Sequence, residues 1–292
     1  MAIDTSTEII EKNGVLVGPL RRPRNSGRAG EGSIHHDETA QKVGFRGGTI
    51  AGSVHMGQFP PLLLRAFGQR WFETGTLSCY FKNATISDEA VRCFVQVPPA
   101  GAADAQVRVW MERDDGMQVL EGTASVGSPK ERTLLRERLE EHLPERGETR
   151  IYAHLEPGME LPAQKTRVEP LSEERLSLLT EPLSWYTGAS PWGGPIAGPQ
   201  QVVGAMRRVE QGIGHRNRGV GLFGAIEVRY INGPVFIGRD YDVAAKVLAV
   251  GETPRSEYWW YESIMSEPDS GKEVAAMIMM LRMMKASSEL WQ

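Results

Sequence analysis

The amino-acid sequence predicts an α+β protein built as two similar halves, each with one helix followed by consecutive antiparallel strands. The first observation is a repeat: "GGTIAG" at 47–52 returns as "GGPIAG" at 193–198, an offset of 146 residues and half the length of the 292-residue chain. The second is that a helix-compatible stretch and four strand-like runs follow each copy in the same order. We therefore predict two repeats at 1–129 and 150–292, joined by a linker at 130–149.

Each repeat is expected to contain an entry loop and then one helix. In the first half the helical stretch is 53–73, where Pro60 and Pro61 should kink or split it, because proline lacks a backbone N–H and clashes with the preceding turn. In the second half the stretch is 199–212, and Pro199 suits a first helical turn.

The strand-like runs are rich in β-branched and aromatic residues, and turn signals separate them. They cover 76–83, 89–97, 105–113 and 117–126 in the first half and 223–232, 241–250, 256–265 and 272–284 in the second. The last run is rich in methionine and alanine, which also favour helices, but its place in the repeat predicts a strand buried on both faces. Its methionines are then expected to fill the core and not to serve a cofactor.

The linker contains a short amphipathic pattern. Leu135, Leu139 and Leu143 fall four residues apart among charged residues, which predicts a surface helix with a solvated face.

Composition narrows the class of protein. The 33 basic and 37 acidic residues leave a net charge of -4, so we expect no surface-wide binding to nucleic acid or to an anionic membrane. Only Cys79 and Cys93 occur, too few for a disulfide framework. The first twenty residues lack a secretory pattern and no apolar run is long enough for a membrane span, so a cytoplasmic protein is expected.

Candidate chemistry is confined to the first half, where His35, His36 and Asp37 precede the glycine repeat. Imidazole and carboxylate groups are common general acids and bases. The matching stretch before the second copy, "TEPLSWYTGASPWGG", contains neither histidine nor aspartate, so any chemistry should be asymmetric. The alternative is structural: Asp37 caps a turn, and a histidine hydrogen-bonds to nearby backbone.

A third histidine, His55, follows Gly52 by three residues and is expected at the pocket or in the core. A zinc site made with His35, His36 and Asp37 is the weaker alternative, because no known zinc spacing is present, and we expect no metal.

The duplicated order of helix and strands resembles the hotdog fold in its fused, double-hotdog form. The stretch "IHHDETAQKVGFRGGTIAG" resembles the MaoC-like (R)-specific enoyl-CoA hydratase and dehydratase family, with a histidine, an aspartate and a glycine-ended turn in the family's order. In the second half, Tyr230, Pro234, Val235 and Gly238 resemble the family's aromatic-x-x-x-Pro-Val-x-x-Gly strand pair.

This resemblance implies water addition to an acyl thioester, with an aspartate and histidine as acid/base pair. It also implies that backbone N–H groups at Gly52 and Ser53 hold the thioester oxygen. The family aspartate lies five residues before the histidine, where this chain has Gly30 if His35 is used, or Glu31 if His36 is used. Two pairs stay open: Glu31 with His36, and Asp37 with His35.

The departures from the family pattern leave other functions open. Thioester hydrolysis, which other hotdog proteins perform, is the alternative reaction, and a non-catalytic protein that binds acyl or small hydrophobic groups is a further one. Expected partners are acyl-CoA or acyl-carrier thioesters, with coenzyme A as part of the substrate and no separate cofactor. Exposed sheet edges would also allow a homodimer of pseudo-dimers.

Two further residue sets are substrate candidates. Trp185, Tyr186 and Trp192 could line a tunnel for an acyl tail or simply form core. Arg21, Arg22 and Arg24 carry guanidinium groups suited to the phosphates of coenzyme A, or form a basic surface strand.

Overall fold

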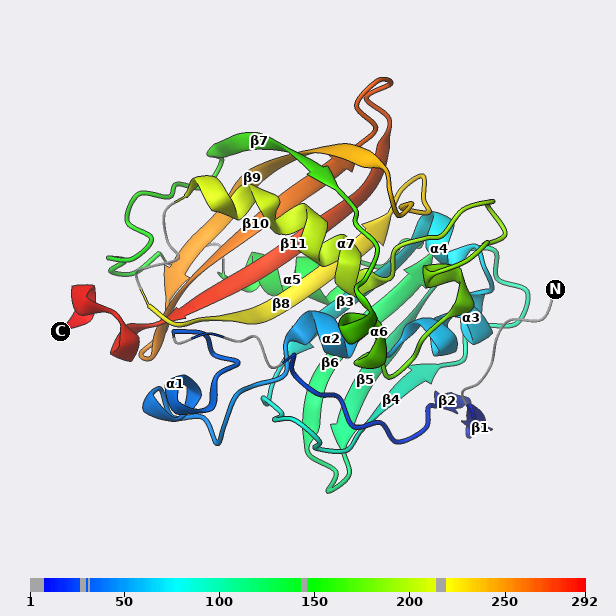
Figure 1. Cartoon of the computed structure of the whole chain (residues 1–292), viewed down its shortest axis with the longest axis horizontal. Coiled ribbons are helices and arrows are strands. Elements are labelled where there is room, and N and C mark those ends of the chain that lie inside the picture. Colours follow the sequence, from blue (N-terminus) through cyan, green and yellow to red (C-terminus); the bar gives the residue numbers. More distant parts are fainter. Residues whose placement is uncertain (1–7, 27–29, 31, 143–145, 214–218) are drawn as a thin grey trace.

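The computed structural model describes residues 8–26, 30, 32–142, 146–213 and 219–292, which form one eleven-stranded antiparallel sheet with helices on both faces (Figure 1). Its strands, in the order in which they neighbour one another, are β1 (Ile10–Lys12), β2 (Val15–Val17), β4 (Val91–Gln96), β5 (Ala105–Arg113), β6 (Gln118–Val126), β3 (Gly75–Phe81), β8 (Gly221–Tyr230), β11 (Glu273–Met284), β10 (Ser256–Ser266), β9 (Asp240–Glu252) and β7 (Glu160–Arg167). Each of the eight strand-like runs in the sequence is therefore a strand.

The sheet is symmetric about its central pair of strands. β3 and β8 pair antiparallel with Ser78 opposite Glu227, and this pair joins the two halves. Outward from it, β6 matches β11, β5 matches β10, and β4 matches β9. The two repeats predicted from the sequence thus form a single continuous sheet, and an approximate twofold axis between β3 and β8 relates them.

The helices of the two repeats lie on one face of this sheet (Figure 1). The helical elements are α1 (Asp37–Lys42), α2 (Gly52–Met56), α3 (Pro60–Phe67), α4 (Trp71–Thr74), α5 (Leu134–His142), α6 (Glu173–Ser177), η1 (Ser184–Tyr186), α7 (Pro199–Met206), η2 (Arg207–Gly212), η3 (Lys285–Ser287) and η4 (Glu289–Trp291). The first repeat's helix is split where Pro60 and Pro61 begin α3, and Pro199 is the first residue of α7, as predicted. α2 and α7 contact each other.

The methionine-rich run is strand β11, buried on both faces. Met277, Met279 and Met283 belong to the main core under the helices, whereas Met280 packs in a smaller cluster on the other face. This alternation is that of a strand. Four of the methionines fill the core as predicted, whereas Met284 at the end of the strand is half-buried.

The linker helix α5 packs on the opposite face of the sheet from α2 and α7. Leu135 is fully buried there and Leu139 is partly buried, while Leu143 lies outside the described residues. The Leu135 N–H donates to Ser78 Oγ at 3.2 Å, and Thr133 Oγ1 donates to the buried Glu227 at 2.5 Å. The linker therefore covers the seam between the two halves.

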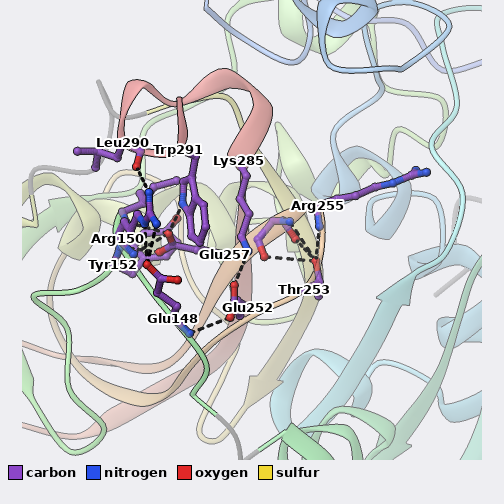
Figure 2. A network of polar contacts seen from close by, with 12 residues as sticks. Glu148, Arg150, Tyr152, Glu252, Thr253, Arg255, Glu257, Lys285, Leu290 and Trp291 are labelled. Carbon is purple, nitrogen blue, oxygen red and sulfur yellow. Dashed lines mark hydrogen bonds and ion pairs between the residues drawn. The ribbon is translucent and has the colours of Figure 1, made fainter.

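A buried carboxylate ties the chain after the linker to the sheet (Figure 2). Glu257 on β10 accepts the backbone N–H groups of Arg150, Ile151 and Tyr152 at 2.8–2.9 Å, and the indole N–H of Trp291 at 2.6 Å. Because four donors satisfy this carboxylate, its burial costs little, and it fixes both residues 150–152 and the C-terminal segment.

Candidate functional site

A pocket of about 570 Å³ lies between the two halves. We call it the larger pocket because it is the larger of two that share His35 in their lining. The first half contributes the segment around His35, the start of α2 and the residues after β3, and the second half contributes the start of β8, residues 253–256 and the end of β11. Three basic side chains also line this pocket, those of Lys82, Arg255 and Arg282. Its apolar wall includes Ile34, Phe45, Ile50, Phe81, Leu222 and Phe223.

The segment that carries His35 is anchored across the two halves. Ile34 and Ala40 are buried together with Val220, which directly precedes β8. The wall of the larger pocket formed by Ile34, His35 and Phe45 is therefore held by an apolar contact with the opposite repeat.

His35 is fixed by the backbone of the glycine repeat. Its Nδ1 lies 2.6 Å from the carbonyl oxygen of Thr49, which can only accept, so Nδ1 carries the proton. The other ring nitrogen, Nε2, is then an unprotonated base in the neutral imidazole. His35 is half-buried and lines the larger pocket, which gives this base access to a bound molecule.

A second pocket of about 390 Å³ meets the first at His35 and Ala51, which line both. We call it the arginine pocket, because its lining includes Arg24, Arg175 and Arg207. No carboxylate occurs among the described residues that line either pocket.

The start of α2 lies at the same junction. Gly52 lines the larger pocket and Ser53 the arginine pocket. A helix leaves its first N–H groups without intrahelical acceptors, and these groups favour negative charge. The two backbone positions predicted to hold an oxyanion therefore lie with His35 where the pockets meet.

Two glycines of the repeat make this close packing feasible. A Cβ at Gly48 would overlap the carbonyl group of His35, and a Cβ at Gly52 would overlap the ring of Phe81. Both glycines are needed because other groups approach the backbone directly.

The other residues predicted as catalytic are placed differently. Asp37 is exposed, is the first residue of α1, and accepts the N–H of Gly48 at 2.7 Å, so its carboxylate braces the glycine turn. His36 precedes α1 and lines neither pocket, and its buried Nδ1 has no hydrogen-bond partner among the described residues. Glu31 lies outside the described residues.

His55 lines the larger pocket and is almost fully buried, with 3% of its surface exposed. Its Nε2 lies 2.8 Å from Thr85 Oγ1, and its Nδ1 lies 3.2 Å from the amide nitrogen of Gln58. Burial lowers the pKa of His55 from 6.5 to about 4, so its ring is neutral at physiological pH. Sequence reasoning missed Thr85 and Gln58.

The three predicted phosphate-binding arginines separate in the structure. Arg21 donates to the buried Glu181 at 2.8 Å, and Arg22 donates to the backbone oxygen of Asp88 at 2.7 Å. Arg24 alone of the three lines a described pocket, together with Arg175, and neither has an ion-pair partner among the described residues.

Matching hydrogen bonds identify equivalent residues in the second half. The Thr49 N–H donates to the Ile34 carbonyl at 3.0 Å, and the Ile196 N–H donates to the Trp185 carbonyl at 2.9 Å. The residue after each acceptor is His35 in one half and Tyr186 in the other, which makes these two positions equivalent.

The same comparison covers the other polar residues of the site. The N–H of Ile50 donates to Thr85 and that of Ala197 donates to Val235, both at 2.8 Å, so Thr85 corresponds to Val235. Counting from the starts of α2 and α7, His55 corresponds to Val202. In the second half, these polar side chains are thus replaced by a buried tyrosine and two buried valines.

Three aromatic residues of the second half, for which the sequence left a tunnel wall and core open, line neither pocket: Trp185, Tyr186 and Trp192. The Trp185 and Trp192 rings lie 5.6 Å apart and pack with Phe72 at 6.1 and 6.2 Å, and the Tyr186 ring lies against Gly198. Phe72 belongs to α4, so the first half contributes an aromatic residue to this packing.

The described residues contain neither a metal-binding cluster nor a membrane-spanning helix. The described residues hold no group of three or more His, Cys, Asp or Glu side chains placed to bind a metal ion. No helix in that part of the chain has both the length and the apolar character needed to cross a membrane.

This chain resembles known proteins in its fold and not in its sequence. No protein-family model and no curated protein sequence matches the chain. A MaoC domain dehydratase from Chloroflexus aurantiacus J-10-fl has a TM-score of 0.58 at 14% sequence identity, over 86% of this chain and 87% of that chain. A conserved Mycobacterium tuberculosis protein with a double hotdog fold has a TM-score of 0.56 at 10% identity, over 85% and 86%.

A third structure, the tesB protein of Mycobacterium avium subs paratuberculosis, has a TM-score of 0.50 at 13% identity and covers 95% of each chain. All three align over most of both chains. The chain therefore has the double hotdog fold, as predicted, and its structural neighbours include a MaoC-like dehydratase.

Proposed function

We propose that this protein is an acyl-thioester hydratase or dehydratase in which His35 moves the proton. The observation that carries the proposal is the position of His35: its Nδ1 is held by the Thr49 carbonyl, and its ring lines two pockets that meet beside the start of α2. The fold shared with a MaoC domain dehydratase supports the same reaction class.

The two pockets suit the two ends of an acyl thioester. The larger pocket has the apolar wall that an acyl chain needs. The arginine pocket offers guanidinium groups at Arg24 and Arg175 to the phosphates of a coenzyme A or carrier arm. A substrate that spans both pockets would place its thioester at the junction, beside His35 and Gly52.

One base at that junction is sufficient for hydration. His35 Nε2 takes a proton from water as the water oxygen bonds to C3 of the enoyl group, and the C2–C3 π electrons move toward the thioester oxygen. The free N–H groups at the start of α2 stabilise the resulting enolate oxygen. The His35 imidazolium then returns its proton to C2, which completes the addition of one water molecule, and dehydration is the reverse.

Thioester hydrolysis is the second candidate, favoured by the lack of a carboxylate among the described residues that line the pockets. In that reaction, His35 activates water for attack on the thioester carbonyl carbon. The same N–H groups stabilise the oxyanion, and the thiol leaves with the proton from His35.

One incubation separates the two reactions. Purified protein is mixed with trans-2-enoyl-CoA esters of four to twelve carbons, and samples are analysed by mass spectrometry and with a thiol reagent. Hydration predicts a product one water heavier with no free thiol, whereas hydrolysis predicts free coenzyme A. No turnover of any ester by folded protein would contradict both and leave a binding protein.

A further inference from the structure

We propose that the larger pocket contains a second binding site, formed by Thr85 with His55 and Gln58, that receives a hydroxyl group carried by the acyl chain. The inference rests on the proposed function in one respect only, namely that the chain bearing this hydroxyl is an acyl group. It specifies the substrate class: acyl groups with an additional oxygen function, distinct from plain alkyl chains.

The three side chains form a buried hydrogen-bonded row that ends at the pocket. Gln58 and His55 are 2% and 3% exposed, and Thr85 is 1% exposed. The row runs from the Gln58 amide to His55 Nδ1, and from His55 Nε2 to Thr85 Oγ1, at 3.2 and 2.8 Å. Thr85 and His55 both line the larger pocket, so a molecule bound there lies against the Thr85 end of the row.

The direction of the hydrogen bonds follows from the first donor. The Gln58 amide nitrogen donates to Nδ1, so the neutral ring carries its proton on Nε2 and donates it to Thr85 Oγ1. The low pKa of His55, caused by its burial, keeps the ring in this neutral form. Thr85 Oγ1 has no other hydrogen bond among the described residues, so it keeps a hydroxyl proton to donate and a free lone pair. A ligand hydroxyl can satisfy both, because it accepts and donates.

The row lies apart from the reacting position. His35 and Thr85 flank the segment at residues 49–50 on opposite sides: His35 hydrogen-bonds to the Thr49 carbonyl, and the Thr85 carbonyl accepts the N–H of Ile50. Thr85 therefore suits an oxygen further along the acyl chain and not the thioester itself.

Packing alone does not explain these residues. The second half builds the same backbone with Val202 and Val235 at the positions of His55 and Thr85, and both valines are buried. A buried polar row has a desolvation cost that valines avoid. The polar row is present in the half where His55 and Thr85 line the larger pocket, and this indicates a role in binding.

The row superficially has the order of a nucleophile, a base and an orienting group. His55 is nevertheless a weak base because burial disfavours its charged form, and its orienting partner is a neutral amide without a carboxylate behind it. A hydrogen-bonding role for Thr85 is therefore better supported than covalent catalysis.

The test compares matched ligands on matched variants. Binding of hexanoyl-CoA and of 4-, 5- and 6-hydroxyhexanoyl-CoA is measured by titration calorimetry on wild-type protein, Thr85→Val and Thr85→Ser. We expect at least one hydroxylated ester to bind wild type roughly tenfold more tightly than hexanoyl-CoA, the worth of one hydrogen bond. Thr85→Val should abolish this preference by weakening the hydroxylated ester more than hexanoyl-CoA, and Thr85→Ser should retain it.

The outcome that overturns the proposal is an equal affinity for all four esters in wild type, or an equal loss for all four in Thr85→Val. A parallel titration with hexan-1-ol and 1-fluorohexane, which lacks the hydroxyl, followed by NMR shifts of the His55 ring, does not depend on thioester binding. Preference for the alcohol that depends on Thr85, with no binding of any CoA ester, would support the hydroxyl site and contradict the proposed function. Binding of all esters with no preference for the alcohol would support thioester binding and contradict the hydroxyl site.

Discussion

His35 and Tyr186 occupy equivalent positions in the two halves, each following a residue whose carbonyl oxygen accepts an N–H from the segment before the repeat's helix. His35 lines two pockets, whereas the Tyr186 ring is 5% exposed and packs against Gly198. One copy of the duplicated fold thus keeps a polar junction, and the other copy is filled by aromatic side chains.

The hydroxyl of Tyr186 is buried and has no hydrogen-bond partner among the described residues. Removing it in Tyr186→Phe should leave the free energy of unfolding unchanged or raise it by about 1 kcal/mol, because no hydrogen bond is lost. Tyr261→Phe is the matched control: the Tyr261 hydroxyl donates to buried Glu210 at 2.6 Å, so its loss should cost about 2 kcal/mol. Urea unfolding measures both, and an equal loss in the two variants would contradict this account.

Gly48 should tolerate no side chain. Gly48→Ala forces the backbone away from the carbonyl of His35, so we expect at least a tenfold loss of turnover and a lower free energy of unfolding. Gly194 has the same place in the repeated sequence, but a Cβ there would lie 3.8 Å from its nearest neighbour, Phe236. Steady-state kinetics of Gly48→Ala and Gly194→Ala should therefore differ, and equal kinetics would show that the close approach is unimportant.

Asp37 should act as a brace and not as an acid or base. Asp37→Asn keeps an oxygen that can accept the Gly48 N–H, so its turnover should stay within about threefold of wild type. A carboxylate that transfers protons would instead lose roughly 10²–10⁴-fold on this change. Turnover measured across pH 5–9 distinguishes the two roles, and Asp37→Ala should be the less stable variant.

His55 should make stability depend on pH. Its folded pKa of about 4 lies below the unfolded value of 6.5, so the unfolded chain binds the extra proton between these limits. The contribution of His55 to the free energy of unfolding is fully present above pH 6.5, and it falls by about 3 kcal/mol as the pH drops to 4. Denaturant unfolding of wild type and His55→Val at pH 7.5 and 4.5 tests this; the fall should be smaller in the variant, and parallel falls would contradict it.

The architecture could be predicted from the sequence because repetition and periodicity are local signals. The run at 272–284 is ambiguous by composition, yet its place in the repeat correctly predicts strand β11. Proline likewise marks the start of α3 and α7, because its geometry restricts the chain wherever it occurs.

The site could be predicted only in part. Three adjacent polar residues, His35, His36 and Asp37, look interchangeable in the sequence, but successive side chains at a helix start point in different directions, and one of the three lines the pocket. Trp185 and Trp192 are large and apolar, which suits both a tunnel wall and a core, and residue type alone does not separate these.

Thr85 was missed because a single threonine after a strand carries no motif. A superposition of the two halves would have revealed it, since Thr85 occupies the position equivalent to Val235. The two copies of the sequence motif align residue 51 with residue 197, an offset of 146. The backbone hydrogen bonds instead make residue 51 equivalent to residue 198, so the structural offset between the halves is one residue larger.

The central claim is that proton transfer depends on His35, and turnover of an enoyl-CoA ester by His35→Asn and His36→Asn tests it most directly. Asparagine at 35 retains a donor for the Thr49 carbonyl but has no basic nitrogen. We expect a roughly 10²–10⁴-fold lower kcat for His35→Asn and near wild-type kcat for His36→Asn, with both variants folded. Wild-type kcat in His35→Asn, or loss only in His36→Asn, would contradict it.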